Sequence, residues 1–221
     1  MSLSSSQIAP SILSFPHADL RVPLRAMETS GVGLIHLDVM DGQFVPPITF
    51  GDGLARSVHS MINIPMEAHL MTLNPERQVD AFADAGCFRM IFHAEATFHS
   101  YRCIQQIHDA GMEAGIAINP GTSLAAIEEV IADANSVLIM TVNPGYGGQK
   151  FIPEMVNKIA KLRELNPQVL IEVDGGIDPT TIHIASRAGA QLFVVGSYLQ
   201  KPATIQEAVN NLVNGSDETE I

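Results

Sequence analysis

The sequence alternates eight times between a short apolar run and a segment of helical periodicity, and this repetition constrains the fold more than any other feature. Turn residues bound each apolar run, which is the pattern of βα units around a parallel sheet. The strands are predicted at residues 8–13, 33–39, 65–71, 89–93, 113–118, 136–142, 169–173 and 191–195. Eight such units predict one α/β domain, a (β/α)8 barrel of the TIM type. The alternative is an open doubly wound sheet, which the absence of Gly-x-Gly-x-x-Gly after the first strand disfavours.

A helix is expected between each pair of strands. Prolines in the expected first turns and glycines suited to a left-handed C-terminal cap mark several of these helices. The prolines are Pro75, Pro153 and Pro179, and the glycines are Gly86, Gly111 and Gly189.

Composition excludes several classes of protein. A net charge of -12, from 12 basic and 24 acidic residues, disfavours binding to nucleic acid or to an anionic membrane. No apolar run approaches the roughly 18 residues needed to span a bilayer. Cys87 and Cys103 lack the spacing of a disulfide framework and are expected to be reduced thiols in a cytoplasmic protein. The barrel is predicted over residues 7–214, between a disordered or artificially added start (1–6) and a polar tail (215–221).

Four ionisable residues lie on strands that should be apolar, because both faces of such strands are buried. Burying an ionisable group costs free energy, so the presence of each one requires an explanation. His36 and Asp38, at i and i+2 of the second strand, point to the same side. His69 lies near the end of the third strand, and Asp174 closes the seventh. If this side faces the barrel interior, all four side chains meet at the C-terminal rim.

Two imidazoles and two carboxylates at one rim predict a site for a first-row transition-metal ion, and zinc, iron, manganese and cobalt are all compatible with it. Hydrogen-bonded core polar groups are the alternative for any single one of these residues. Glu67 and Glu172, two residues deeper, are expected to orient the metal ligands, or else to form an ordinary buried network. His93 and Glu95 follow the fourth strand and are expected to line the site rather than to bind the metal.

Glycine-bearing loops after the sixth, seventh and eighth strands predict a phosphate pocket, because glycine lets backbone amides approach an anion and barrels often bind phosphate there. The residues concerned are Gly145, Tyr146, Gly147, Gly148, Gly175, Gly176, Gly196 and Ser197. Taken by itself, the glycine-rich segment after the sixth strand could also be a flexible loop.

These motifs together resemble the ribulose-phosphate 3-epimerase family over nearly the whole chain. The matching segments are IAPSIL (8–13), HLDVMDGQFVP (36–46), HLM (69–71), VNPGYGGQ (142–149), EVDGGI (172–177) and VGS (195–197). The resemblance implies a (β/α)8 barrel that interconverts D-ribulose 5-phosphate and D-xylulose 5-phosphate with one divalent metal ion. It also implies a homo-oligomer.

Roles follow from the resemblance residue by residue. His36, Asp38, His69 and Asp174 would bind the metal, and the two aspartates would also be the acid and base. Ser11 and His69 would contact the substrate, a small sugar phosphate, and the three glycine-bearing loops would surround its phosphate. Three positions differ from the family's usual residues: Gln43, Pro47 and Tyr146.

The expected chemistry needs both aspartates, because inversion removes a proton from one face of a carbon and returns one to the other. A metal ion would stabilise the enediolate between these steps. Met40, Met71 and Met140, each near a strand end, are expected to line the apolar side of the site, with core packing as the alternative. A Schiff-base mechanism is disfavoured because no predicted strand carries a lysine.

Two other functions remain open. The unusual residues at 43, 47 and 146 lie in loops over the expected sugar site, so the substrate could be a hexulose 6-phosphate such as allulose 6-phosphate. A non-catalytic sugar-phosphate-binding protein is the alternative of a different class, although it would not need Asp38 and Asp174.

Overall fold

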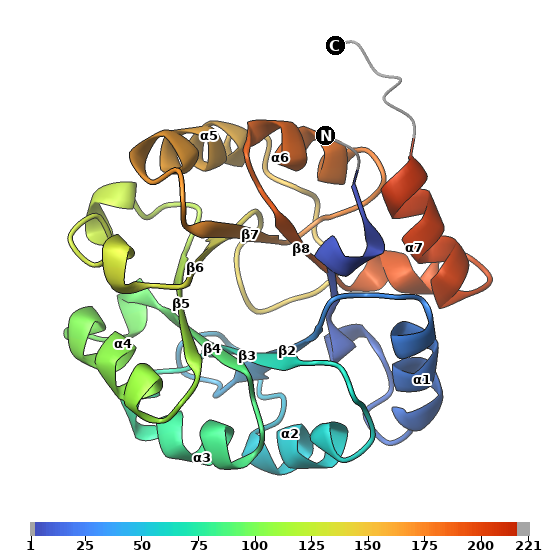
Figure 1. The fold of residues 1–221 in the computed structure, drawn as a ribbon, viewed down its shortest axis with the longest axis horizontal. Coiled ribbons are helices and arrows are strands. Elements are labelled where there is room, and N and C mark those ends of the chain that lie inside the picture. Colours follow the sequence, from blue (N-terminus) through green and yellow to red (C-terminus); the bar gives the residue numbers. More distant parts are fainter. Residues whose placement is uncertain (1–2, 216–221) are drawn as a thin grey trace.

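Eight parallel strands surround a central axis, with helices outside them, in the computed structural model, which describes residues 3–215 (Figure 1). The strands are β1 (Ile8–Pro10), β2 (Ile35–Met40), β3 (Met66–Met71), β4 (Arg89–His93), β5 (Glu113–Ile118), β6 (Ser136–Met140), β7 (Leu170–Asp174) and β8 (Leu192–Val195). Leu3 is buried and Ser5–Gln7 form a 3-10 turn, η1. Residues 1–2 and 216–221, which belong to the predicted start and tail, lie outside the described residues.

The strands are hydrogen-bonded in the order β1-β8-β7-β6-β5-β4-β3-β2, and every pair is parallel. Between β1 and β2 the described chain has one isolated parallel bridge, Ser11 to His36, in place of a ladder. The barrel is therefore nearly closed, and the predicted (β/α)8 fold is confirmed.

In the described part of the chain, seven α-helices surround the strands (Figure 1). They are α1 (Arg21–Thr29), α2 (Asp52–His59), α3 (Val79–Asp84), α4 (Ser100–Asp109), α5 (Met155–Leu165), α6 (Thr181–Ala188) and α7 (Ile205–Asn214). The three predicted cap glycines, Gly86, Gly111 and Gly189, have φ angles of 86°, 83° and 117°. Their left-handed conformation confirms the predicted ends of α3, α4 and α6.

The expected helix between β5 and β6 is not an α-helix. Hydrogen bonds there join residues three apart, such as Ile127 N to Leu124 O and Val130 N to Ile127 O, both 3.0 Å. They form two 3-10 turns, η5 (Leu124–Ala126) and η6 (Ile131–Asp133). Ile127 and Ile131 are buried, so packing fixes a segment whose β-branched residues favour the α-helix only weakly.

Several element boundaries also differ from the prediction. β1 ends at Pro10 because the Ser11 hydroxyl accepts the backbone N–H of Leu13 at 3.2 Å and turns the chain into η2 (Ile12–Ser14). Pro153 and Pro179 each lie two residues before their helix rather than in its first turn. Pro75 does begin a helical turn, the 3-10 turn η3 (Pro75–Arg77), which precedes α3.

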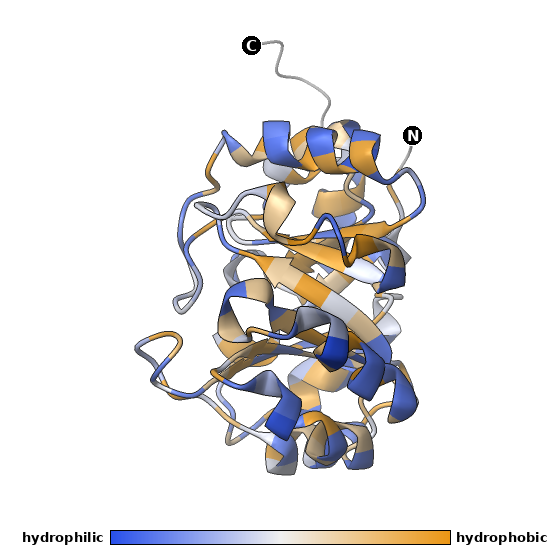
Figure 2. Cartoon of the chain, turned by 90° about the vertical axis from the view of Figure 1, so that its left-hand side faces the viewer, coloured by the Kyte–Doolittle hydropathy of each residue, from blue (hydrophilic) through white to orange (hydrophobic). Residues whose placement is uncertain are grey.

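Side chains along each strand alternate between the barrel interior and the layer of helices, and both sets are buried. Figure 2 shows the resulting band of hydrophobic strands between helices with hydrophilic outer faces. The apolar interior positions include Ala9, Ile91, Ala117, Leu138 and Leu192. On β2 and β3, His36, Asp38, Glu67 and His69 fill the equivalent positions, so the barrel is polar on one side.

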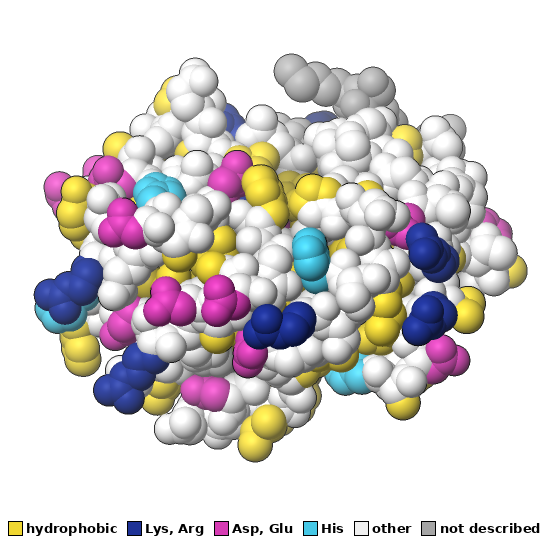
Figure 3. Space-filling model, turned by 60° about the horizontal axis from the view of Figure 1, so that its bottom comes forward, with side chains coloured by type: hydrophobic (Ala, Val, Ile, Leu, Met, Phe, Trp, Pro, Cys, Tyr) yellow, Lys and Arg dark blue, Asp and Glu magenta, His cyan; other side chains and the backbone are white. Residues whose placement is uncertain are grey.

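The surface carries no sign of a nucleic-acid-binding stripe on the face drawn in Figure 3, where Lys and Arg side chains of the described chain are interspersed with Asp and Glu. Within residues 3–215, no helix combines the length and the apolar character needed to cross a bilayer. Cys87 and Cys103 are both buried free thiols.

Candidate active site

Four ionisable side chains converge inside the barrel, as predicted. His36 Nε2 lies 3.3 Å from Asp38 Oδ1, and His69 Nδ1 lies 3.2 Å from the same oxygen and 3.7 Å from Asp174 Oδ2. The strand register explains the first three, because β2 pairs with β3 so that Asp38 stands opposite His69. One potential ligand atom from each of the four residues lies within 4.8 Å of the others.

This donor set fits a divalent metal ion. Ligand atoms about 2.0–2.2 Å from a tetrahedral zinc ion lie roughly 3.3–3.6 Å from one another, and the contacts of His69 and His36 with the two carboxylates span 3.2–3.7 Å. His36 Nδ1 is hydrogen-bonded to Glu67 Oε1 at 2.8 Å, which leaves Nε2 free to bind a cation. Two imidazoles with two carboxylates suit several first-row metals and select none of them.

Buried glutamate and arginine side chains lie beneath the four converging residues and form hydrogen bonds with one of them. Glu67 accepts a hydrogen bond from Arg89 Nη1 at 2.9 Å, and Arg89 also donates twice to Glu113 Oε2, at 3.0 and 2.6 Å. Glu67 therefore contacts His36 on one side and Arg89 on the other, an arrangement that both expectations for Glu67 allow. Sequence reasoning missed Arg89, although an arginine that begins an apolar strand was a usable signal.

Glu172 belongs to the same buried group and differs from Glu67. Its Oε1 lies 3.6 Å from His36 Nδ1, and neither carboxyl oxygen has a hydrogen-bond partner among the described residues. Burial and repulsion from Glu67 raise the pKa of Glu172 to about 8. Burial opposes ionisation of Glu67 as well, but the hydrogen bond and charge of His36 lower the pKa of Glu67 to about 2.

The two aspartates have opposite electrostatic surroundings. Burial disfavours the charged form of Asp38, but attraction to His36 and the hydrogen bond from His36 outweigh it and lower the pKa of Asp38. Burial and repulsion from Asp38 raise the pKa of Asp174 to about 7. One carboxyl group is therefore held ionised while the other tends to keep its proton, which is the division of labour that an acid/base pair needs.

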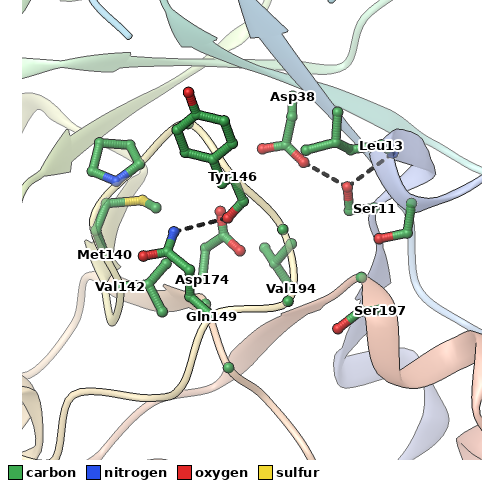
Figure 4. Close-up of a pocket in the computed structure, with 18 of the residues that line it drawn as sticks. Ser11, Leu13, Asp38, Met140, Val142, Tyr146, Gln149, Asp174, Val194 and Ser197 are labelled. Atoms are coloured by element: carbon green, nitrogen blue, oxygen red, sulfur yellow. Dashed lines mark hydrogen bonds between the residues drawn. The ribbon is translucent and has the colours of Figure 1, made fainter. Parts of the chain in front are cut away.

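A solvent-connected cavity lies above this cluster. Among its lining residues are Ser11, Asp38, Met40, Met71, Met140, Gly145, Tyr146, Gly147, Gly148, Asp174, Gly175, Gly176, Gly196 and Ser197. Figure 4 shows Asp38 and Asp174 entering it from different strands, with Tyr146 and Ser197 on the surrounding loops. His36 and His69, fully buried, lie beneath it. The structure thus brings the residues predicted for catalysis, metal binding and the phosphate pocket into the cavity or directly under it.

The loops after β6, β7 and β8 meet at one side of this cavity, as predicted for a phosphate pocket. Gly145, Gly148, Gly175 and Gly176 have φ angles of 115°, 75°, 120° and 67°, which glycine adopts readily. Within residues 3–215 no lysine or arginine side chain lines the cavity, so backbone amides and hydroxyls are the groups available to an anion.

The Ser11 hydroxyl donates a 2.5 Å hydrogen bond to Asp38 Oδ2, so it fixes one oxygen of that carboxylate (Figure 4). Thr141, which sequence reasoning missed, supports the other aspartate. Its hydroxyl lies 2.9 Å from the carbonyl oxygen of Asp174 and 2.6 Å from that of Gly175. A threonine directly after a buried strand gave no distinctive signal.

The expectation that His93 and Glu95 line the site is wrong. Neither borders the cavity: the ring of His93 instead packs against the rings of His69 and Phe44. His93 is fully buried behind His69.

Comparison with known proteins agrees with the motifs. The model of the "Ribulose-phosphate 3 epimerase family" matches residues 7–200. The curated ribulose-phosphate 3-epimerase of Rhodobacter capsulatus is 44% identical over 203 residues, which cover 91% of this chain and 89% of that protein. That of Bacillus subtilis is 41% identical over 211 residues, covering 93% and 97%.

Solved structures support the fold alone. A tryptophan synthase alpha-subunit variant from Pyrococcus furiosus superposes with a TM-score of 0.71 at 13% identity and covers 96% of this chain and 99% of its own. The 3-hexulose-6-phosphate synthase of Salmonella typhimurium gives 0.70 at 14%, covering 94% and 96%.

Proposed function

The chain belongs to the ribulose-phosphate 3-epimerase family, and from this premise we propose that it interconverts D-ribulose 5-phosphate and D-xylulose 5-phosphate by proton transfer through Asp38 and Asp174. The observation that carries the proposal is the convergence of these two carboxyl groups on one cavity from β2 and β7, which are not neighbours in the barrel. A sugar between them presents one face to each.

Each aspartate acts on one face of the reacting carbon. One carboxylate removes the proton from C3, and the protonated carboxyl group opposite returns a proton to the other face, which inverts the centre. In the reverse reaction the two groups exchange roles. Ser11 holds Oδ2 of Asp38 by its 2.5 Å hydrogen bond and so fixes the orientation of that carboxylate toward the cavity.

His36, Asp38, His69 and Asp174 would hold the divalent metal ion, with zinc as our first choice. The ion supplies positive charge that stabilises the negative charge developing on the substrate's oxygens. Met40, Met71 and Met140 give the cavity an apolar wall that limits access of water to the reacting carbon.

The phosphate group fits the other end of the cavity, where Gly147, Gly176 and Gly196 supply backbone amides and Ser197 a hydroxyl. Fixing the phosphate there leaves the sugar extended toward the aspartates. We also propose that the enzyme is a cytoplasmic homo-oligomer. Size-exclusion chromatography with light scattering measures its oligomeric state.

The substrate is tested by measuring kcat/KM for ribulose 5-phosphate and for allulose 6-phosphate with the same preparation. We expect the pentulose phosphate to be preferred. Equal or faster turnover of the hexulose phosphate would assign the enzyme to the longer sugar. Binding of both sugars without epimerisation would identify a non-catalytic sugar-phosphate-binding protein instead.

A further inference from the structure

Behind His69 lie two polar residues that the proposed reaction does not use, His93 at the end of β4 and Glu95 in η4 (Ala94–Ala96). His69 Nε2 is 2.8 Å from His93 Nε2, and the two rings stack with their centroids 5.0 Å apart. Both histidines are fully buried. Because two ring nitrogens at this distance share one hydrogen, one of them must carry it while the other offers a lone pair.

Glu95 decides the direction of this hydrogen bond. Its Oε2 faces His93 Nδ1 at 3.4 Å, and that nitrogen has no hydrogen-bond partner among the residues that the structure describes. A carboxylate only accepts hydrogen bonds, so it favours the tautomer of His93 that carries its hydrogen on Nδ1. His93 Nε2 then offers a lone pair, and His69 must donate from Nε2.

The carboxylate of Glu95 is itself fixed from behind. Its Oε1 accepts the backbone N–H of Asn119 at 2.8 Å and the hydroxyl of Thr122. Lys158 on α5 fixes the same loop, because its ammonium group donates hydrogen bonds to the carbonyl oxygens of Asn119, Pro120 and Thr122, at 3.0, 2.8 and 2.7 Å. Glu95 is thus held where it can act on the tautomer of His93.

The consequence reaches the proposed metal site. With its hydrogen on Nε2, His69 has a free lone pair on Nδ1, the atom that lies 3.2 Å from Asp38 Oδ1 and 3.4 Å from His36 Nε2. With the opposite tautomer, Nδ1 would carry a hydrogen and could not bind a cation. We propose that His93 and Glu95 are positioning residues, which hold His69 in the tautomer that binds the metal.

This inference rests on the metal site of the proposed function, so its test measures zinc affinity rather than turnover. The dissociation constant of Zn²⁺ is measured by competition with a chelating dye for the wild type and three variants. His93→Phe keeps a ring but removes the acceptor, and we expect it to weaken zinc binding about 10- to 100-fold. His93→Gln supplies an amide oxygen as acceptor, and we expect it to restore most of the affinity.

Glu95→Gln tests the same series of hydrogen bonds while keeping the shape of the side chain at position 95. The backbone N–H of Asn119 requires an oxygen at the Oε1 position, so the new amide nitrogen would face His93 Nδ1 and donate to it. His93 would then carry its hydrogen on Nε2, and His69 would be forced into the tautomer that cannot bind. We expect a loss of zinc affinity similar to that of His93→Phe.

His108→Gln is the matched control, because His108 Nε2 also lies 2.9 Å from an oxygen acceptor, Asn135 Oδ1, but on the outer helix α4. Its zinc affinity should equal that of the wild type. Equal affinities of His93→Phe and His93→Gln would show that His93 only fills space and would overturn the proposal. If His93→Phe does not fold, wild-type affinity in Glu95→Gln overturns it. A wild type that binds no zinc would instead remove the zinc site of the proposed function, and this inference with it.

Discussion

Asp38 and Asp174 carry the same functional group, yet their neighbours favour opposite charge states. Asp38 faces His36, which stabilises its ionised form, whereas Asp174 faces the charge of Asp38. The difference arises from position in the barrel, because the chemical groups are identical.

Replacement of either aspartate by asparagine should stop epimerisation, because each variant lacks one of the two proton carriers. We expect kcat to fall by at least about 10²- to 10⁴-fold in Asp38→Asn and in Asp174→Asn, the range that general acid/base catalysis contributes. Turnover of ribulose 5-phosphate is followed together with the metal content of each variant. Near-normal turnover by either variant would contradict the assigned roles.

The metal-free protein should respond to pH through Asp174. Its pKa is raised from 3.8 to about 7 on folding, so the folded state binds the proton more tightly and the contribution of Asp174 to stability is lost as pH rises from about 4 to 7. Asp174→Asn should therefore stabilise the metal-free protein at pH 8 by at least about 1 kcal/mol, since one pKa unit corresponds to about 1.4 kcal/mol. At pH 4 the two proteins should be nearly equal.

Asp38→Asn is the control of opposite sign for this measurement. The pKa of Asp38 is lowered on folding, so its contribution to stability is present above pH 4 and is lost on acidification. The variant should be less stable than the wild type at pH 8. Urea unfolding at both pH values measures these differences, and destabilisation by Asp174→Asn at pH 8 would refute the electrostatic account.

At the scale of elements, contacts between the loops after the strands determine the shape of the pocket. Gly176 follows β7 with φ at 67°, and a Cβ atom there would lie 2.3 Å from the backbone nitrogen of Phe151. The loops after β6 and β7 therefore touch through a glycine, and a side chain at this point must separate them.

Gly176→Ala should consequently weaken substrate binding as well as the fold. We expect KM for ribulose 5-phosphate to rise roughly 10-fold or more, because displaced backbone amides no longer meet the phosphate. Gly111→Ala is the matched control, with φ at 83° and no atom near its added Cβ. It should lose about 1 kcal/mol of stability through backbone strain alone and keep the wild-type KM. Equal KM values in the two variants would contradict the pocket assignment.

At the scale of the whole molecule, closure of the barrel and assembly of the site depend on the same residues. β1 and β2 meet through the bridge between Ser11 and His36, and the Ser11 hydroxyl also holds Asp38. The first and second βα units therefore close the sheet where the proposed metal ligands lie, so a metal ion bound there would also connect β2, β3 and β7.

Metal binding should for this reason stabilise the folded chain. Zn²⁺ at 100 times its Kd should add about 2.7 kcal/mol to the free energy of unfolding, roughly 5–10 °C in Tm for a chain of this size. Chelation should reverse this gain and abolish turnover. Differential scanning calorimetry and metal analysis of the same samples provide the measurement. Full activity in a sample proven to be metal-free would refute the metal's role.

The repeated pattern of apolar runs and caps determined the fold without reference to tertiary contacts, because strand burial and helix ends are local requirements. The cap glycines Gly86, Gly111 and Gly189 were predicted correctly for that reason. The residues from 119 to 135 were not, since their conformation depends on how Ile127 and Ile131 pack beneath neighbouring elements.

Some features of the candidate site could likewise be predicted from the sequence, and others could not. The candidate ligand residues and the glycine-bearing loops could be picked out from the sequence, because a polar residue on a buried strand costs free energy unless it has a partner or a function. Only the tertiary structure decided that Arg89 supports Glu67, that His93 stands behind His69, and that Asp174 keeps its proton more readily than Asp38. These properties depend on distances between side chains from different strands, which the order of residues along the chain does not specify.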